Sequence, residues 1–295
     1  MVTIKKTPPD FKVEELINLS YSNGKYAYFK LFKRDYDTLK AIETISRASK
    51  IPVKSFGWAG NKDKRAETTQ YISILNPKKE KIKNLNLRDL KLTFLGYGAK
   101  KINLGNNYGN KFEIKVYNYK EYYPSNFFIN YFGEQRFGKN NWIIGKKILK
   151  KEKIVLDIKR KRFCLFAYQS YLWNNCVKEF FKDKPNTFKI GGYIFLNKQI
   201  TNLKIPIINF DTKLKSNIGE IYKYLLKKEG ISQKDFIIKS DPRLITETVY
   251  RDLIVEVKDL RFDNSTLHFT LPKGSYATVF IRQLFREDIA NPRLP

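Results

Sequence analysis

The chain has 295 residues, of which 42% are hydrophobic and 15% aromatic, so it can bury a sizeable core and is not globally disordered. Its 57 lysine and arginine side chains outnumber its 29 acidic ones, and the net charge of +28 favours a polyanionic partner, nucleic acid before an anionic membrane. With two cysteines and one histidine, the chain cannot form a disulfide framework or the usual zinc sites. Nucleophilic catalysis assisted by a histidine would depend on His268, and no pattern of partner residues lies near it in the sequence.

The hydrophobic pattern predicts strands and helices in a mixed order. Residues 11–35 alternate in strand fashion around a hairpin-type turn at Ser22-Asn23-Gly24, and Tyr36 to Ser49 has helical spacing. A long helix is expected from about Phe163 to Phe181, and a final helix from about Tyr276 to Glu287. Further strands are expected at 69–74, 92–95, 112–116, 253–257 and 267–271. Because the two kinds of element do not alternate regularly, the expected fold class is α+β.

No membrane-spanning or targeting segment is indicated. No apolar run approaches the ~20 residues of a membrane span, and residues 1–9 are not followed by an apolar signal core. We therefore expect a cytoplasmic protein, or a nuclear one if the source is a eukaryote. The abundance of lysine and asparagine also fits the codon bias of an AT-rich genome, which would explain part of the charge but not where it clusters.

Two glycine-containing segments lack the spacing of nucleotide-binding loops. The segment that begins at Gly96 carries Lys101 where the third glycine of a dinucleotide loop belongs. Residues 105–112 have the wrong spacing for a P-loop and no Ser or Thr after the lysine. The sequence therefore indicates no nucleotide cofactor.

One loop places a single acid among cations. Asp63 is flanked by Lys62, Lys64 and Arg65. Neighbouring cations keep a carboxylate ionised and close to substrate phosphates, as a general base or a nucleophile requires. The alternative is a solvated turn in which Asp63 caps a short helix, although Ala66 occupies the position where a capping box has Glu or Gln.

Two later segments have the composition of an RNA-binding surface. Residues 130–138 (NYFGEQRFG) combine aromatic rings, amides and glycines with one arginine, which can stack a base and hydrogen-bond its edge; a tight turn with phenylalanine in the core is the alternative. Residues 146–162 hold nine basic side chains against two acids, and they form either a solvated face or a surface that follows a phosphate backbone.

The remaining reactive side chains are expected to be structural. Cys164 and Cys176 have apolar neighbours in the long helix, which predicts small buried side chains rather than ligands. His268 lies between Leu267 and Phe269 in a predicted strand, where a structural role is expected.

Together these segments resemble the TruD family of pseudouridine synthases, named for uridine 13 of tRNA. The resemblance spans the whole chain, with a looser match at about 180–250. Four blocks match in the family's order, and a basic Gly-Asn-x-Phe element also has counterparts at Lys100-Lys101 and 109–112. The blocks are FKVEE at 11–15, GNKDKRA at 60–66 with Thr68, Thr69 and Gln70, NYFGEQRFG at 130–138, and FTLPKGSYAT at 269–278 running on to Arg282.

The resemblance implies a catalytic domain built on a mixed, largely antiparallel sheet, with an inserted TruD-specific α/β domain. On this sequence the catalytic domain would comprise residues 1–155 and 258–295, and the insertion residues 156–257. The family implies tRNA as partner, no metal, no cofactor and no membrane, and we expect a monomer.

Site residues can be carried over where the motifs match. The resemblance implies that Asp63 is the catalytic aspartate and Lys62 its cationic partner. It implies that Phe132 stacks on the target base and that Asn130 supports the loop and the aspartate. Gln70 and Arg136 are weaker candidates for ordering the site and contacting RNA. Cations are expected to bind the RNA at Lys64, Arg65, Lys159, Arg160 and Lys161.

The implied reaction fits this inventory of residues. Pseudouridine formation breaks the C1′–N1 bond, rotates the uracil and rejoins it through C5, with no net redox change. The aspartate can attack the sugar, add to the base or remove a ribose proton, and the sequence does not choose between these routes. A target inside folded tRNA must also be flipped from its stack.

The sequence leaves three alternative functions open. A catalytically silent tRNA-binding or chaperone protein would share the charge and the aromatic side chains, although the intact Lys62-Asp63 pair argues against it. A basic membrane-surface protein would need an amphipathic helix, whereas the aromatic spacing of 163–181 suits a core. The same chemistry could also act at another uridine, such as position 35 of tyrosine tRNA.

Overall fold

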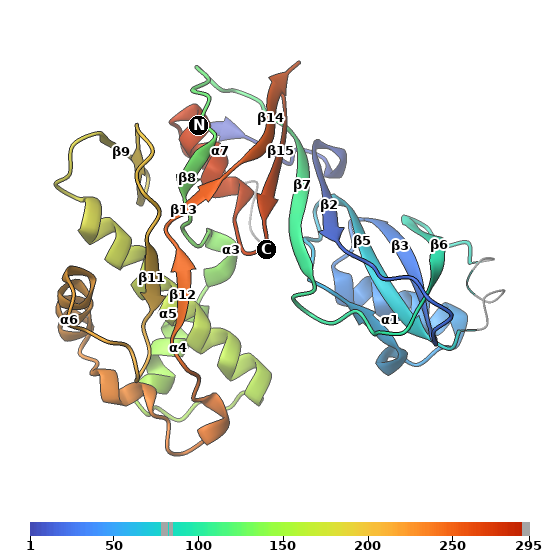
Figure 1. The fold of residues 1–295 in the computed structure, drawn as a ribbon, viewed down its shortest axis with the longest axis horizontal. Coiled ribbons are helices and arrows are strands. Elements are labelled where there is room, and N and C mark those ends of the chain that lie inside the picture. The colour runs from blue at the N-terminus through green and yellow to red at the C-terminus, as the bar shows by residue number, and fades with distance from the viewer. Residues whose placement is uncertain (78–81, 83–84, 291–295) are drawn as a thin grey trace.

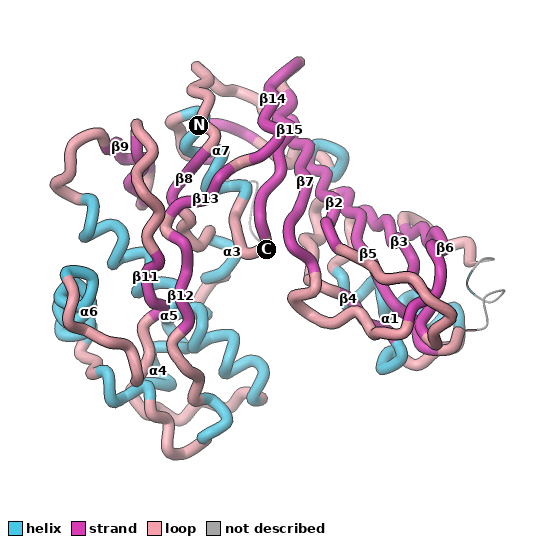
Figure 2. Tube along the Cα trace, viewed as in Figure 1, coloured by secondary structure: helices cyan, strands magenta, loops and turns pink. Residues whose placement is uncertain are grey.

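A computed structural model describes residues 1–77, 82 and 85–290, and Figure 1 shows two lobes on either side of a group of central strands. Strands run across the lobe on the right, and most of the helices lie in the lobe on the left (Figure 2). The helices are α1 (Thr38–Ser49), α3 (Glu134–Phe137), α4 (Asn141–Leu149), α5 (Ile158–Phe181), α6 (Asn217–Glu229) and α7 (Ala277–Phe285). The strands are β1 (Val2–Thr3), β2 (Phe11–Ile17), β3 (Tyr26–Arg34), β4 (Phe56–Trp58), β5 (Glu67–Leu75), β6 (Leu90–Gly98), β7 (Asn107–Lys115), β8 (Phe127–Ile129), β9 (Thr187–Ile190), β10 (Tyr193–Leu196), β11 (Lys204–Ile207), β12 (Val249–Asp252), β13 (Ile254–Glu256), β14 (Lys258–Asp263), β15 (Thr266–Pro272) and β16 (Ile289–Ala290).

The large sheet is mixed and mostly antiparallel. Its strand order is β14-β15-β7-β2-β5-β3-β6, with β4 paired to β5 off this path. Strands β2 and β5 run parallel, with Val13 opposite Thr68, while the other neighbours are antiparallel. The expected α+β class and the mixed, largely antiparallel sheet are confirmed.

The hydrophobic pattern explains how α1 covers this sheet. Along β3, Phe29, Leu31 and Lys33 alternate on the buried face, and the first two pack against Ile42 and Ile45 of α1. The helix begins at Asp37, whose carboxylate accepts a hydrogen bond from Lys40 N, so a free backbone donor of the first turn is satisfied. The loop that contains Asp63 is therefore supported by a packed layer.

The helical lobe is organised around α5, which starts five residues earlier than expected because Asp157 caps it. Trp173 and Tyr168 of α5 are fully buried, and Cys164 and Cys176 are buried as predicted. Helix α4 packs against α5, and β13 pairs with β8, so contacts cross both expected domain boundaries. Residues 291–295 of the expected catalytic domain lie outside the described part of the chain.

The predicted hairpin around Ser22-Asn23-Gly24 is wrong. Strands β2 and β3 do not pair, because β5 lies between them in the sheet. Gly24 is required instead by a close approach, since a Cβ atom there would clash with the carbonyl carbon of Gly98. The local turn signal correctly marks a break between strands, but the partners of those strands depend on residues 67–75.

Candidate active site

A cleft of ≈ 940 Å³ opens beside the Asp63 loop. Its walls come from β2, β7, α3, the loop at 61–65 and the segment at 274–278. The fold therefore brings the sequence blocks that contain Asp63, Gln135 and Tyr276 to one cavity, although they lie far apart in the chain.

The Asp63 carboxylate is held from two other segments. Lys5 Nζ lies 2.8 Å from Asp63 Oδ2, and Gln135 Nε2 donates to Oδ1. Lys5 is brought there by the N-terminal strand β1, which pairs with β16 at the other end of the described chain. The Asp63 side chain keeps 28% of its surface exposed, so a substrate in the cleft can reach the oriented carboxylate.

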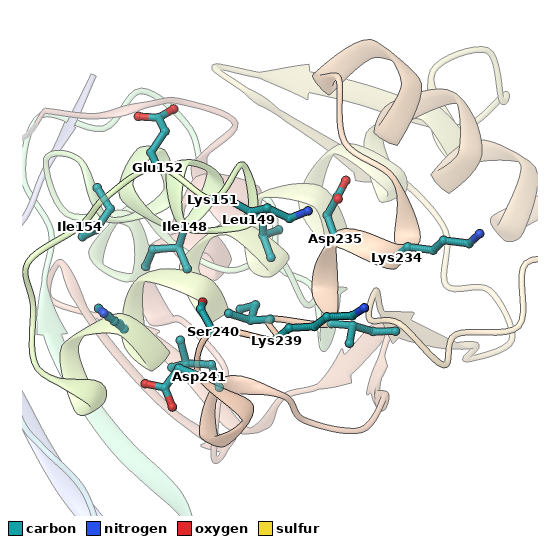
Figure 3. Close-up of a pocket in the computed structure, with 14 residues that line it drawn as sticks. Ile148, Leu149, Lys151, Glu152, Ile154, Lys234, Asp235, Lys239, Ser240 and Asp241 are labelled. Atoms are coloured by element: carbon teal, nitrogen blue, oxygen red, sulfur yellow. The ribbon is translucent and has the colours of Figure 1, made fainter.

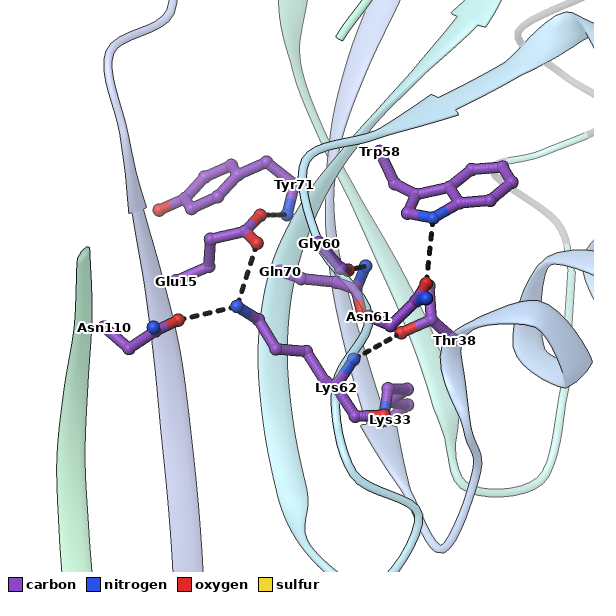
Figure 4. Close-up of polar contacts among 10 residues, drawn as sticks. All are labelled: Glu15, Lys33, Thr38, Trp58, Gly60, Asn61, Lys62, Gln70, Tyr71 and Asn110. Carbon is purple, nitrogen blue, oxygen red and sulfur yellow. Dashed lines mark hydrogen bonds and ion pairs between the residues drawn. The ribbon is translucent and has the colours of Figure 1, made fainter. Parts of the chain in front are cut away.

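Lys62 makes its ion pair with a different acid, so the expectation that Lys62 is the cationic partner of Asp63 is wrong. Lys62 Nζ lies 2.9 Å from Glu15 Oε1 and donates to Asn110 Oδ1 at 2.6 Å (Figure 4). Glu15 is completely buried on β2, and a buried carboxylate needs a cation beside it. Lys62 supplies that charge, which ties the loop to β2 and β7.

Side-chain hydrogen bonds also fix the backbone of the loop. Thr38 Oγ1 accepts from Lys62 N at 2.9 Å and donates to Gln70 Oε1 at 3.0 Å, and Gln70 Nε2 donates to Gly60 O at 3.4 Å. Gln70 is fully buried beneath the loop. Its contacts agree with an ordering role, while its burial disagrees with the expected contact to substrate or RNA.

A buried lysine supports the aspartate from below. Lys33 is fully buried, and its ammonium donates to the backbone oxygens of Asp63 at 2.9 Å and of Tyr36, with Lys62 O at 3.5 Å. Burial lowers the pKa of Lys33 to about 8, because the charged form is poorly solvated inside the fold. Lys33 thus connects β3 to the main chain of the residue that faces the cleft.

Phe132 does not offer an open face to the cleft. Its ring is 2% exposed and makes edge contacts with Phe166, Trp173 and Tyr276. The Arg251 guanidinium covers it at 4.0 Å from the ring centroid. The expected stacking of Phe132 on a base therefore disagrees with this structure, in which the ring belongs to the core.

The polar residues of the same segment also differ from expectation. Arg136 packs its guanidinium over Phe166 at 4.6 Å and does not line the cleft. Asn130 hydrogen-bonds to Arg251 and to the backbone of Asp252, so it supports its own segment. Gln135, rather than Asn130, reaches Asp63.

The expected RNA-binding cations fall into two groups. Lys64 and Arg65 are exposed and line the Asp63 cleft. Lys159 and Arg160 are exposed on the first turn of α5, and Lys161 lines a second cavity of ≈ 830 Å³ whose wall shares no residue with the first (Figure 3). The structure does not bring the second group to the cleft.

Several residues of the site were not predicted from the sequence. Lys5 is one of many lysines and lies 58 residues from its partner, and Gln135 lies in a segment whose other side chains were the expected site residues. Lys33 had a usable signal, because it continues the inward alternation of Phe29 and Leu31. Among the described residues, no helix is long and apolar enough to span a membrane.

Comparisons with known proteins agree with one another. The sequence model of the family described as tRNA pseudouridine synthase D (TruD) matches residues 1–154 and 193–284. The tRNA pseudouridine synthase D of Aquifex aeolicus is 30% identical, covering 98% of this chain and 99% of its own. The protein named "Probable tRNA pseudouridine synthase D" of Thermococcus onnurineus is 39% identical, covering 96% and 94%. The crystal structure of the protein described as "Putative tRNA pseudouridine synthase D (TruD)" from Methanosarcina mazei is 24% identical, covers 97% of this chain and 94% of its own, and superposes with a TM-score of 0.69.

The fold and these relatives first define a class of enzyme: an isomerase of the pseudouridine synthase type. The chain belongs to the tRNA pseudouridine synthase D (TruD) family. The resemblance, the fold class and the isomerase activity expected from the sequence are thereby confirmed.

Proposed function

We propose that this enzyme converts uridine 13 of tRNA to pseudouridine and that Asp63 is its catalytic carboxylate. The observation that carries the proposal is the position of Asp63: it is accessible in the cleft and held by Lys5 and Gln135. The relatives named for tRNA pseudouridine synthesis support tRNA as the substrate. The proposed enzyme is a cytoplasmic monomer.

The arrangement suits a carboxylate that must stay oriented. The Lys5 ammonium pairs with one carboxylate oxygen, while the Gln135 amide donates to the other and fixes the rotation of the carboxylate. The reaction breaks the C1′–N1 bond and forms a C1′–C5 bond; C5 loses a proton and N1 gains one, so atoms and charge balance. Asp63 can act on the sugar, on the base or as the proton acceptor within this scheme.

We assign Lys62 and Gln70 to positioning rather than to substrate contact. Lys62 neutralises buried Glu15, and Gln70 holds the loop through Thr38 and Gly60. Both therefore act on the reaction through the geometry of Asp63.

The flipped uracil is proposed to pack against Tyr276, with Phe132 behind it. Tyr276 lines the cleft together with Asp63, and its ring contacts the edge of Phe132 at a centroid distance of 6.2 Å. Stacking of a base on an aromatic ring contributes about 1–3 kcal/mol. Replacing Tyr276 by leucine should raise KM with little change in stability, whereas Phe132→Leu should lower stability; the reverse pattern would restore Phe132 as the platform.

Choice of uridine must come from the shape of the tRNA. The cations at the cleft, Lys64 and Arg65, contact any phosphate backbone, and stacking accepts any base. We propose that residues 156–257 form an inserted domain and that this domain grips a second part of the tRNA. The exposed cations at the start of α5 belong to that surface.

Incubation with unmodified tRNA transcripts, followed by chemical mapping of pseudouridine, tests this function. We expect product at position 13, and a much higher rate on full tRNA than on the isolated D stem-loop. Product only at position 35 would reject the substrate position while leaving the chemistry in place. Equal rates on both RNAs would reject recognition of shape, and binding without turnover would indicate the silent tRNA-binding protein.

A further inference from the structure

One side chain of the inserted part of the chain, Arg251 of β12, joins two segments of the active-site wall. Arg251 Nε donates to Asn130 O at 2.8 Å, and Arg251 Nη2 donates to Asn130 Oδ1 at 2.6 Å and to Gly274 O at 2.9 Å. The same guanidinium lies over Phe132. Three segments that are distant in sequence therefore meet at a single planar group.

Both segments that Arg251 holds continue directly into the cleft. Residues after Asn130 lead to Gln135, which donates to the Asp63 carboxylate. Residues after Gly274 lead to Tyr276, which lines the same cleft. Gly274 has φ +82°, a left-handed conformation that favours glycine, and a Cβ atom there would lie 3.6 Å from Arg251 Nη1. The turn thus has a conformation that favours glycine and lies beside the guanidinium.

Arg251 is an unusual choice for a purely structural position. Among the described residues it forms no ion pair with a carboxylate, and its burial lowers its pKa to about 10, so the group stays charged at neutral pH at an energetic cost. Backbone and amide oxygens offset that cost only if they converge on the planar fork. An arginine can satisfy this geometry, whereas a lysine has one ammonium centre and cannot span the acceptors in the same way.

We propose that Arg251 is a positioning residue of the isomerisation: it fixes the wall that carries Gln135 and Tyr276 opposite Asp63. The proposal rests on the proposed role of Asp63. Its first consequence is that Arg251 acts on turnover more than on tRNA affinity, because it touches protein oxygens and not the cleft. Its second is that lysine at this position is only a partial substitute.

The test compares Arg251→Met, Arg251→Lys and the control Arg261→Met on full-length tRNA transcripts. Arg261 lies exposed on strand β14, which belongs to the large sheet. Since a displacement of about 1 Å in an active site can cost about 100-fold in rate, we expect Arg251→Met to lose about two orders of magnitude in kcat with tRNA binding nearly unchanged. Arg251→Lys should be intermediate, and Arg261→Met should match the native enzyme.

Circular dichroism and thermal unfolding show whether each variant is folded. If Arg251→Met fails to fold, the role of the guanidinium is tested by Arg251→Lys and by adding methylguanidinium to Arg251→Ala. Recovery of kcat on addition of methylguanidinium requires a guanidinium at that position. A native kcat in folded Arg251→Met would overturn the proposal. A kcat higher than that of the native enzyme would also overturn it, because it would show that Arg251 covers Phe132 and obstructs the base. Asp63→Asn is assayed in parallel: its inactivity beside an active Arg251→Met rejects only the role of Arg251, whereas an active Asp63→Asn rejects the proposed function itself.

Discussion

Replacing Lys33 by methionine should make the stability of the protein depend differently on pH. The change keeps most of the side-chain volume and removes a buried ammonium beneath Asp63. In the folded protein, burial lowers the pKa of Lys33 from 10.5 to about 8. The negative charges of Asp63 and Asp37 oppose this shift, and the positive charge of Lys62 adds to it. The charged lysine is therefore disfavoured in the folded state relative to the unfolded chain.

The expected magnitude follows from the shift. Each pKa unit corresponds to about 1.4 kcal/mol, so the penalty for holding charged Lys33 is about 3 kcal/mol when the pH is below about 8. The unfolded chain binds more protons at this site between about 8 and 10.5, so stability rises with pH in that window. The free energy of unfolding of the native protein, minus that of Lys33→Met, should increase by about 3 kcal/mol from neutral pH to pH 10.5.

Urea unfolding of both proteins at a series of pH values measures this difference. The hydrogen bonds that Lys33→Met cannot make change the difference in unfolding free energy by the same amount at every pH. The contributions of the other titrating groups cancel when the two free energies are subtracted. Lys91→Met, which changes an exposed lysine on β6, should show no such trend. A difference in unfolding free energy between native protein and Lys33→Met that stays constant from neutral pH to 10.5 would refute a charged lysine buried under the Asp63 loop.

Three further changes test other parts of the structure. Lys62→Met leaves buried Glu15 without its cation and should cost about 3–5 kcal/mol of stability in urea unfolding; the double change with Glu15→Gln should recover part of it, and no loss would contradict the buried pair. Phe132→Ala should lower stability by about 3–5 kcal/mol in the same assay, whereas unchanged stability would place the ring outside the core. Neutral substitution of cations at the start of α5 should reduce the salt dependence of tRNA binding by about 0.7–0.9 for each phosphate group that the protein no longer neutralises, and an unchanged slope would place RNA elsewhere; the replaced residues are Lys159, Arg160 and Lys161.

The parts of the structure that local chemistry decides could be predicted from the sequence. The hydrophobic alternation of β3 and the helical spacing of α1 follow from which face each residue buries. The loop around Asp63 stands out because a single acid among three cations is unusual. The matching blocks then indicate the family and the α+β sheet.

Long-range partners could not be predicted in the same way. Adjacency in sequence pairs Lys62 with Asp63, but the structure pairs it with Glu15, 47 positions earlier, because a buried carboxylate attracts the nearest available cation. The Ser22-Asn23-Gly24 turn predicts a hairpin, and only the position of β5 in the sheet shows otherwise. The sequence around Phe132 is typical of a platform for a base. The group that covers its ring, Arg251, lies 119 positions later, so the local sequence does not show that the ring is covered.

The role of Asp63 is tested most directly by Asp63→Asn. The matched control is Asp183→Asn, at an exposed position after α5. Each purified protein is incubated with unmodified full-length tRNA, and pseudouridine is mapped while tRNA affinity is measured in parallel. We expect Asp63→Asn to bind tRNA nearly as well as the native enzyme and to form no pseudouridine, while Asp183→Asn behaves as the native enzyme does. Near-native pseudouridine formation by Asp63→Asn would contradict a catalytic role of the Asp63 carboxylate.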